Sequence, residues 1–126
     1  MFYKKFIFVA VVLAFISCAF AYDVSITQTQ LYAWEDKGSG YAIWEVTMTN
    51  ECGRTIKDLT IIGEKNFNLR NATSDIWAVE PLSGHKYHLP SYVSDHGINH
   101  KNSIKFGYIN TGYQNAEFST CDVQYM

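Results

Sequence analysis

Acidic side chains are the first candidates for chemistry, because glycosidases use a pair of carboxylates that flank the bond to be cleaved. The candidates are Glu35, Asp36, Glu64 and Glu80. They fall in unrelated predicted turns, without the apolar surroundings that would raise the pKa of one carboxyl group. Solvated charge is the usual role of such residues. We therefore predict that the chain is not an enzyme.

Histidines are the next candidates, because imidazole nitrogens bind zinc and other metals. The four histidines form two close pairs, His85 with His88 and His96 with His100. On a strand, His85 and His88 would point to opposite faces of the sheet. His96 and His100 lie in a predicted loop, where solvent contact is the expected role. The sequence therefore predicts no metal site and no cofactor.

Residues 1–21 have the features of a secretory signal peptide. Two lysines precede an apolar run over residues 6–16, and Ala19 and Ala21 fit the small-residue rule for cleavage. The run is shorter than the about twenty residues that cross a bilayer. We predict a secreted, extracellular protein whose mature domain spans residues 22–126, with no membrane contact after cleavage. The alternative is an uncleaved N-terminal anchor.

The mature chain of about 105 residues has the size of one domain. It carries eight Lys and Arg against twelve Asp and Glu, a formal charge of −4, and its cations are scattered singly. Nucleic acid would require a basic patch, so it is not an expected partner. A copper polysaccharide oxygenase would require histidine at the mature N-terminus, where Tyr22 is predicted.

Two cysteines, Cys52 and Cys121, remain after removal of the leader. In an oxidising compartment we expect them to form one disulfide, worth at best about 4 kcal/mol for a loop of about seventy residues. Neither belongs to a Cys-x-x-Cys pair, so a metal or catalytic role is disfavoured. Asn71, followed by Ala72 and Thr73, is a predicted N-glycosylation site.

Alternation of apolar and polar residues between Gly, Asn, Asp and Pro predicts short strands throughout the mature chain. The expected strands are 24–27, 41–49 (the longest), 56–62, 76–79, 86–89, 103–109 and 116–121. A turn around Ser83 and Gly84 would join 76–79 and 86–89 as a hairpin. About seven short strands in this length indicate an all-β fold of two packed antiparallel sheets, an immunoglobulin-like sandwich.

Tyrosine and tryptophan are unusually abundant: the mature chain keeps three Trp and eight Tyr against three Phe. Their rings combine an apolar face with a polar edge, which suits contact with a sugar ring. Packing within a sheet is the alternative role of each Tyr. Trp44 and Tyr108, the latter beside Phe106, alternate with polar residues in predicted strands, so we place them in the core.

Other aromatic residues are candidates for the surface. Trp34 lies in a run of charges and glycines over residues 33–40, which we interpret as an exposed loop or hairpin tip. Trp77 and Tyr92 each follow a polar stretch and are further candidates. Tyr87 is the fourth, although it shares a strand face with Leu89 and packing inward is the alternative. Polar residues expected to hydrogen-bond hydroxyl groups at the rim are Gln28, Gln30, Asn110 and Gln114.

Several short motifs follow one another in a distinctive order. They are Trp34, Tyr41, Val46–Asn50, Ile56–Leu59, Asp75–Trp77, Tyr87–Tyr92 and Phe106–Ile109. Together they resemble carbohydrate-binding module family 49, which occurs at the C-terminus of plant endoglucanases and in secreted proteins of cellular slime moulds. The resemblance covers nearly the whole mature chain. It implies a cellulose-binding sandwich in which Trp34, Trp77 and Tyr92 form a flat surface, with the smaller Tyr92 where the family often has Trp.

The sequence as a whole predicts a secreted, non-catalytic protein that binds cellulose or a related β-glucan in an extracellular matrix or cell wall. Other matrix proteins are possible further partners. The alternative is a secreted protein-binding adhesion or signalling module, because sandwiches of this kind and exposed aromatic residues also serve protein interfaces.

Overall fold

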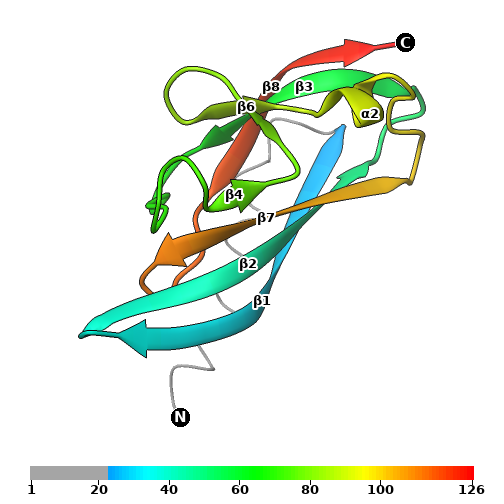
Figure 1. Ribbon diagram of the computed structural model, residues 1–126. Helices are drawn as coiled ribbons and strands as arrows, with labels where there is room; N and C mark the ends of the chain where they lie inside the picture. Colours follow the sequence, from blue (N-terminus) through cyan, green and yellow to red (C-terminus); the bar gives the residue numbers. More distant parts are fainter. Residues whose placement is uncertain (1–22) are drawn as a thin grey trace.

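Two antiparallel four-stranded sheets pack together in the computed structural model, which describes residues 23–126 (Figure 1). Sheet A has the strand order β1-β2-β7-β4, and sheet B has the order β5-β6-β3-β8. The strands are β1 (Val24–Asp36), β2 (Ser39–Asn50), β3 (Ile56–Gly63), β4 (Ile76–Trp77), β5 (Glu80–Pro81), β6 (Lys86–His88), β7 (Ser103–Thr111) and β8 (Phe118–Tyr125). The predicted all-β sandwich is confirmed. The predicted signal peptide and the N-terminal Tyr22 lie outside the described residues.

A long hairpin of β1 and β2 extends beyond the rest of the sandwich (Figure 1). Lys37 and Gly38 form its turn, with φ values of 52° and 84°. Two positive φ values in a two-residue connection match the right-handed twist of paired strands. The strands therefore stay paired up to the turn, and β1, with 13 residues, is longer than β2, with 12. The prediction that 41–49 is the longest strand is wrong, whereas the interpretation of 33–40 as a hairpin tip, the alternative to a loop, fits the turn at Lys37 and Gly38.

The predicted hairpin around Ser83 and Gly84 is present, but its first strand is β5 and not residues 76–79. β4 pairs with β7 in sheet A, whereas β5 pairs with β6 in sheet B. The chain leaves one sheet for the other at Ala78, which has a φ of 67°. Pro81 lies in β5 at the edge of its sheet, where its missing N–H costs no ladder bond. This crossing leaves Trp77 on the last strand of sheet A.

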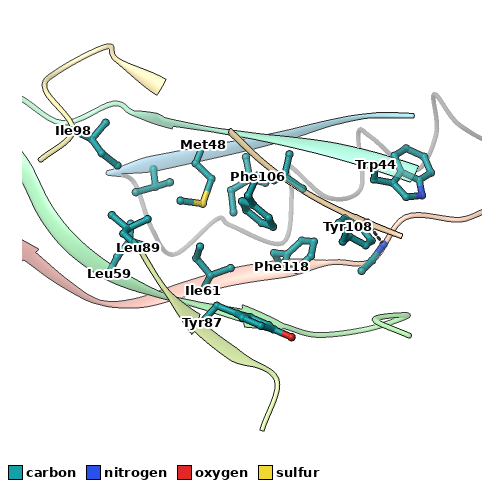
Figure 2. Packing of buried hydrophobic residues seen from close by; sticks show 14 of the residues in the cluster. Trp44, Met48, Leu59, Ile61, Tyr87, Leu89, Ile98, Phe106, Tyr108 and Phe118 are labelled. Carbon is teal, nitrogen blue, oxygen red and sulfur yellow. Dashed lines mark hydrogen bonds between the residues drawn. The ribbon is translucent and has the colours of Figure 1, made fainter. Parts of the chain in front are cut away.

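The core lies between the sheets and is rich in aromatic rings (Figure 2). Trp44, Phe106 and Tyr108 are buried from sheet A, as predicted. From sheet B, Phe118 meets Phe106 and Tyr108 edge to face, with ring centroids 5.4 and 5.3 Å apart. Such pairs contribute about 0.5–1.5 kcal/mol beyond the buried area. Tyr87 is also buried, only 5% exposed, and faces this cluster.

Polar groups in the core are tied to one another around Tyr108. Its hydroxyl donates a hydrogen bond to Gln28 Oε1 over 2.6 Å and accepts one from the Ala116 N–H over 2.8 Å. Gln28 Nε2 in turn donates to the Ala116 carbonyl over 2.7 Å. Gln28 is therefore a buried structural residue, and its predicted place at a binding rim is wrong.

Asn110 is the second predicted rim residue that the structure moves to the interior. Its amide donates to the carbonyls of Asn66 and Gln114 over 2.9 and 3.1 Å, and its Oδ1 accepts from the Asn68 N–H over 2.8 Å. Because both the nitrogen and the oxygen of the side-chain amide are bonded, Asn110 fixes the loop of Asn66 and Asn68 and the loop of Gln114 to the end of β7. Gln30 is half-buried, and Gln114 is exposed.

The expected disulfide is absent, and both Cys52 and Cys121 are free thiols. Cys52 lies in the connection that leads into β3 at Ile56. Cys121 lies on β8 and pairs with Thr60, which is four residues further along β3 than Ile56. Four residues of strand span about 13 Å. This separation exceeds the about 7 Å that the Cα atoms of a disulfide can span, which explains why the two thiols are not joined. Burial and the neighbouring Asp122 raise the pKa of the Cys121 thiol.

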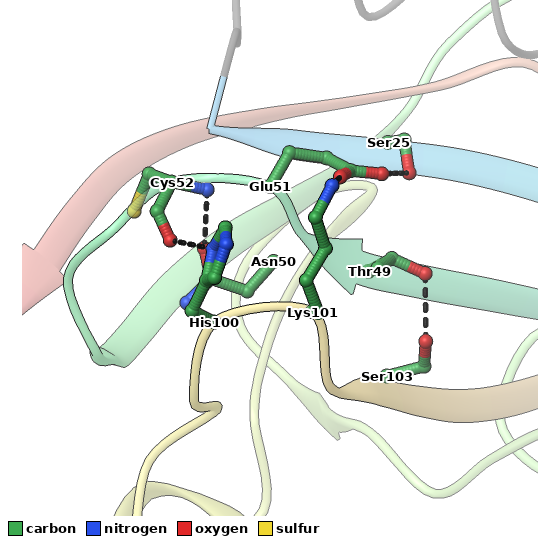
Figure 3. Close-up of polar contacts among 8 residues, drawn as sticks. All are labelled: Ser25, Thr49, Asn50, Glu51, Cys52, His100, Lys101 and Ser103. Atoms are coloured by element: carbon green, nitrogen blue, oxygen red, sulfur yellow. Dashed lines mark hydrogen bonds and ion pairs between the residues drawn. The ribbon is translucent and has the colours of Figure 1, made fainter.

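The end of the sandwich opposite the hairpin turn is fixed by polar contacts (Figure 3). Buried Asn50 donates to the Ile98 carbonyl over 2.7 Å and accepts from the Cys52 N–H over 2.9 Å. His100 Nδ1 lies 2.6 Å from the Cys52 carbonyl oxygen. These contacts attach the loop before β7 to the end of β2. Within residues 23–126 no helix has the length and apolar character needed to cross a membrane.

Candidate functional site

Aromatic side chains gather on the outer surface of sheet A. Partners across an antiparallel ladder point to the same side of the sheet. Trp34 pairs with Tyr41, Tyr32 pairs with Ile43, and Trp77 pairs with Gly107. These positions alternate with the buried residues of the same strands, so they face outward. We refer to Tyr32, Trp34, Tyr41 and Trp77 as the aromatic face.

Three rings of the aromatic face are in contact. The rings of Tyr32 and Trp34 stack with centroids 5.7 Å apart and an interplanar angle of 24°. Trp34 also meets Tyr41, at 5.7 Å and 38°. Tyr32 is 62% exposed, whereas Trp34 is half-buried between its neighbours. The predicted exposure of Trp34 is therefore only partial, because residue 34 lies in a paired strand of the hairpin and its ring is flanked by other rings.

Trp77 covers Gly107 on the neighbouring strand β7. A side-chain carbon at Gly107 would collide with the indole ring, so the ring lies directly against the glycine backbone. Trp77 remains 42% exposed. Beside it is an open hollow of about 160 Å³, lined by Leu31 and by the ion pair of Glu45 and Lys105.

A salt bridge lies between the two tryptophans of the aromatic face. The Arg70 N–H donates to the Ile109 carbonyl over 3.0 Å, which places Arg70 beside β7 in the row between Trp34 and Trp77. Its guanidinium donates to both carboxylate oxygens of Asp75, over 2.7 and 3.1 Å. The guanidinium carbon is 5.7 Å from the Trp34 ring centroid. The hydrogen bond to Asp75 raises the pKa of Arg70.

The two tryptophans lie on the two edge strands of sheet A, β1 and β4, and are also offset along the strand direction. Trp34 pairs with Tyr41 of β2, and Trp77 lies in the row of paired residues that reaches β2 at Glu45. Those rows are four residues, or about 14 Å, apart along the strand. Each aromatic ring that becomes well buried against a sugar contributes about 1–3 kcal/mol. Rigid rings on paired strands lose little side-chain entropy when they bind.

Two of the four predicted binding residues lie away from the aromatic face. Tyr92 is 66% exposed, but it belongs to the short helix α2 (Ser91–Ser94), at the end of the molecule opposite the hairpin turn (Figure 1). Tyr87 is buried on the inner side of β6 beside Phe67, with ring centroids 6.1 Å apart. Its ring has no free face for stacking, so Tyr87 does not fit a surface role and the inward alternative holds.

The predicted site residues did not include Tyr32, Tyr41 or Arg70 of this surface. Tyr32 and Trp34 are two residues apart, the spacing that places side chains on one face of a strand. That signal was present in the sequence but was not used, because 33–40 was interpreted as an exposed loop or hairpin tip. Arg70 follows no local pattern, because its position depends on the contact between the loop before β4 and strand β7.

The acidic and histidine candidates do not converge on a common site. Glu35 and Asp36 lie beside the hairpin turn, and Glu80 pairs with His88 across sheet B, with Oε1 and Nε2 3.3 Å apart. Glu64 accepts a hydrogen bond from the Ser119 hydroxyl. Among residues 23–126 there is no group of three or more His, Cys, Asp or Glu side chains able to hold a metal ion.

Comparison with known proteins agrees with the family that the motif order indicated. The family model of the carbohydrate binding domain CBM49 matches residues 24–113, which include every residue of the aromatic face. No curated protein and no solved structure matches the chain significantly. The match covers more than half of the chain. The chain therefore belongs to the CBM49 family of carbohydrate-binding domains.

Proposed function

We propose that this protein is a secreted, non-catalytic binder of cellulose or a related β-glucan, which it holds on the aromatic face. The observation that carries the proposal is the gathering of Tyr32, Trp34 and Trp77 on the outer side of one sheet. Flat cellulose presents stacked sugar faces with apolar C–H groups, and a row of rings on a sheet complements such a surface.

Binding would depend on rings rather than on charge. Trp34 and Trp77 supply the largest stacking surfaces, and Tyr32 extends the surface along β1. The ring hydroxyl of Tyr32 and the polar groups of Glu45 and Lys105 provide hydrogen bonds at the margin. Because stacking on several rings requires little rearrangement of rigid strands, we expect micromolar affinity without a conformational change.

The test is sedimentation of residues 22–126 with microcrystalline cellulose. Wild type is compared with Trp34→Ala, Trp77→Ala and Tyr92→Ala, after thermal unfolding has shown that each variant is folded. Tyr92→Ala is the matched control, because it removes an exposed aromatic ring at the other end of the molecule. We expect loss of sedimentation with the two tryptophan variants only.

Two results would contradict this proposal. If wild type stays in the supernatant at micromolar concentration, cellulose is not the ligand, and the protein-binding alternative takes precedence. If Tyr92→Ala alone abolishes binding, the ligand binds at α2 and the aromatic face has another role.

The extracellular part of the proposal is tested separately. Asn71 is exposed, and its Oδ1 accepts hydrogen bonds from the N–H and the hydroxyl of Thr73, each over 3.0 Å. We expect the full chain to appear in the culture medium with Tyr22 at its N-terminus and with a glycan at Asn71. Mass spectrometry of the secreted protein before and after enzymatic deglycosylation measures both. Retention of the first 21 residues would refute the predicted cleavage.

A further inference from the structure

We propose that Arg70 contacts the polysaccharide and that Asp75 makes the aromatic face selective for uncharged polymers. This inference rests on the proposed function, since it assigns a residue and a specificity to that surface. It starts from the position of Arg70, the only guanidinium that the described residues place between Trp34 and Trp77.

Asp75 fixes the orientation of the Arg70 guanidinium but does not occupy all of its N–H groups. Two of its five N–H groups bond to the Asp75 carboxylate, over 2.7 and 3.1 Å. Three N–H groups remain for a ligand or for water. The Arg70 side chain is 42% exposed, whereas that of Asp75 is 7% exposed, so a ligand on this surface meets the guanidinium and not the carboxylate.

The geometry suits hydroxyl groups beside a stacked sugar. With the guanidinium carbon 5.7 Å from the Trp34 ring centroid, a sugar resting on Trp34 brings its edge toward Arg70. A planar group with several fixed donors can bond to neighbouring hydroxyl oxygens at once. The rings thus supply contact area, and Arg70 supplies hydrogen bonds of fixed direction.

Asp75 determines which polymers are accepted. A single unpaired cation at this position would attract carboxylated polysaccharides over a distance set by ionic strength. The bidentate contact gives the pair a net charge of zero, so the attraction to carboxylates is cancelled while hydrogen-bond donors remain. Uncharged glucans are therefore the favoured ligands.

The experiment measures affinity for two soluble cellulose derivatives, hydroxyethylcellulose, which is uncharged, and carboxymethylcellulose, which is anionic. Arg70→Lys keeps the positive charge without the planar donor set, and Asp75→Asn keeps the shape while removing the negative charge. The controls are Arg54→Lys, at an arginine whose guanidinium lies 4.2 Å from the Tyr125 ring centroid, and Asp95→Asn, an exposed aspartate at the end of α2.

We expect Arg70→Lys to bind hydroxyethylcellulose about fivefold or more weakly, as loss of one or more hydrogen bonds implies. Asp75→Asn should gain affinity for carboxymethylcellulose relative to hydroxyethylcellulose, and about 0.5 M salt should remove that gain. Neither control should change the ratio. Thermal unfolding is recorded for all four variants, and Arg70→Lys keeps the test valid if Asp75→Asn fails to fold.

The inference is overturned if Arg70→Lys matches Arg54→Lys on hydroxyethylcellulose, or if a folded Asp75→Asn shows no salt-sensitive gain on carboxymethylcellulose. If wild type binds neither derivative nor insoluble cellulose, the proposed function itself fails. Binding by wild type with unchanged variants refutes only the role of the Arg70 and Asp75 pair.

Discussion

Trp77 rests against the backbone of Gly107, which is its ladder partner on β7. The glycine allows the indole ring to lie close to the sheet. The orientation of one of the two indole rings in the aromatic face therefore depends on the absence of a side chain at one position of the next strand.

Replacement of Gly107 with alanine should weaken cellulose binding without unfolding the protein. The added methyl group would displace the exposed ring of Trp77, and we expect an affinity loss of about tenfold, equivalent to about 1.4 kcal/mol. Isotherms on cellulose measure this loss. Gly53→Ala is the control, because a side-chain carbon there meets no atom within 4 Å. Equal binding by both variants would show that the ring position is unimportant.

Tyr108→Phe should lower the free energy of unfolding. The variant leaves Gln28 Oε1 and the Ala116 N–H without their bonds to the hydroxyl, and a buried unsatisfied group costs about 1–3 kcal/mol. Urea unfolding measures this cost. An unchanged free energy would mean that water or a shifted side chain replaces both bonds.

Tyr108 should also make the wild-type domain sensitive to alkali. Burial raises the pKa of its phenol far above the usual value of about 10. The folded protein keeps the phenol neutral, so its stabilising contribution is complete below about pH 10 and declines as pH rises above that value. Ultraviolet titration should show one tyrosine that ionises only on unfolding, and this component should be missing in Tyr108→Phe.

Glu51 should contribute to stability at neutral pH and lose that contribution in acid. Its carboxylate accepts hydrogen bonds from Lys101 over 2.8 Å and from Ser25 over 2.9 Å (Figure 3). These bonds, led by the one from Lys101, lower its pKa below 4.5. A lowered pKa stabilises the fold above about pH 4.5, and the effect disappears as pH falls through the lower folded value.

Thermal unfolding between neutral and acid pH tests this dependence. Glu51→Gln should be less stable than wild type at neutral pH, and the difference should shrink in acid. Glu35→Gln, at the exposed end of the hairpin, is the control for removal of one negative charge. A constant difference at every pH would assign the effect to packing instead.

Truncation after Tyr113 should abolish folding although the matched family region ends there. The missing segment contains β8, which pairs with β3, and the fully buried Phe118. Loss of a core Phe alone costs about 3–5 kcal/mol, a large part of the about 5–15 kcal/mol of a whole domain. Circular dichroism should show an unfolded chain, whereas deletion of Met126, which is 58% exposed, should leave the spectrum unchanged.

Strand positions with regular alternation were predictable from the sequence. Trp44 and Tyr108 alternate with polar or outward residues over whole strands, and both are fully buried. Burial of Gln28 was not predictable, because it depends on a hydroxyl eighty residues away. The partial burial of Trp34 was not predictable for another reason: a run of charges and glycines marks a hairpin tip but does not show how close to the turn the strands remain paired.

Prediction of the site was limited in the same way, because local patterns identify residue types but not contacts between distant segments. Trp34 and Trp77 were identified by residue type, and the ladder of sheet A places them on one surface. Tyr92 has the same chemical character but lies on α2, and only the tertiary fold separates it from the others. Arg70 and Asp75 form a pair whose relevance depends on the position of Trp34, which no local pattern encodes.

The order of strands in the two sheets also governs how fast the domain folds. The β1 and β2 hairpin and the short β5 and β6 hairpin join sequence neighbours over short turns, whereas Tyr41 pairs with Thr111 and Gly63 pairs with Phe118. Pairing of such distant segments requires closure of long loops before any contact forms, and sandwiches of this kind fold in milliseconds to seconds. The hairpin that carries Tyr32, Trp34 and Tyr41 can form early, but Trp77 joins them only when β7 has paired with β2 and β4 has paired with β7.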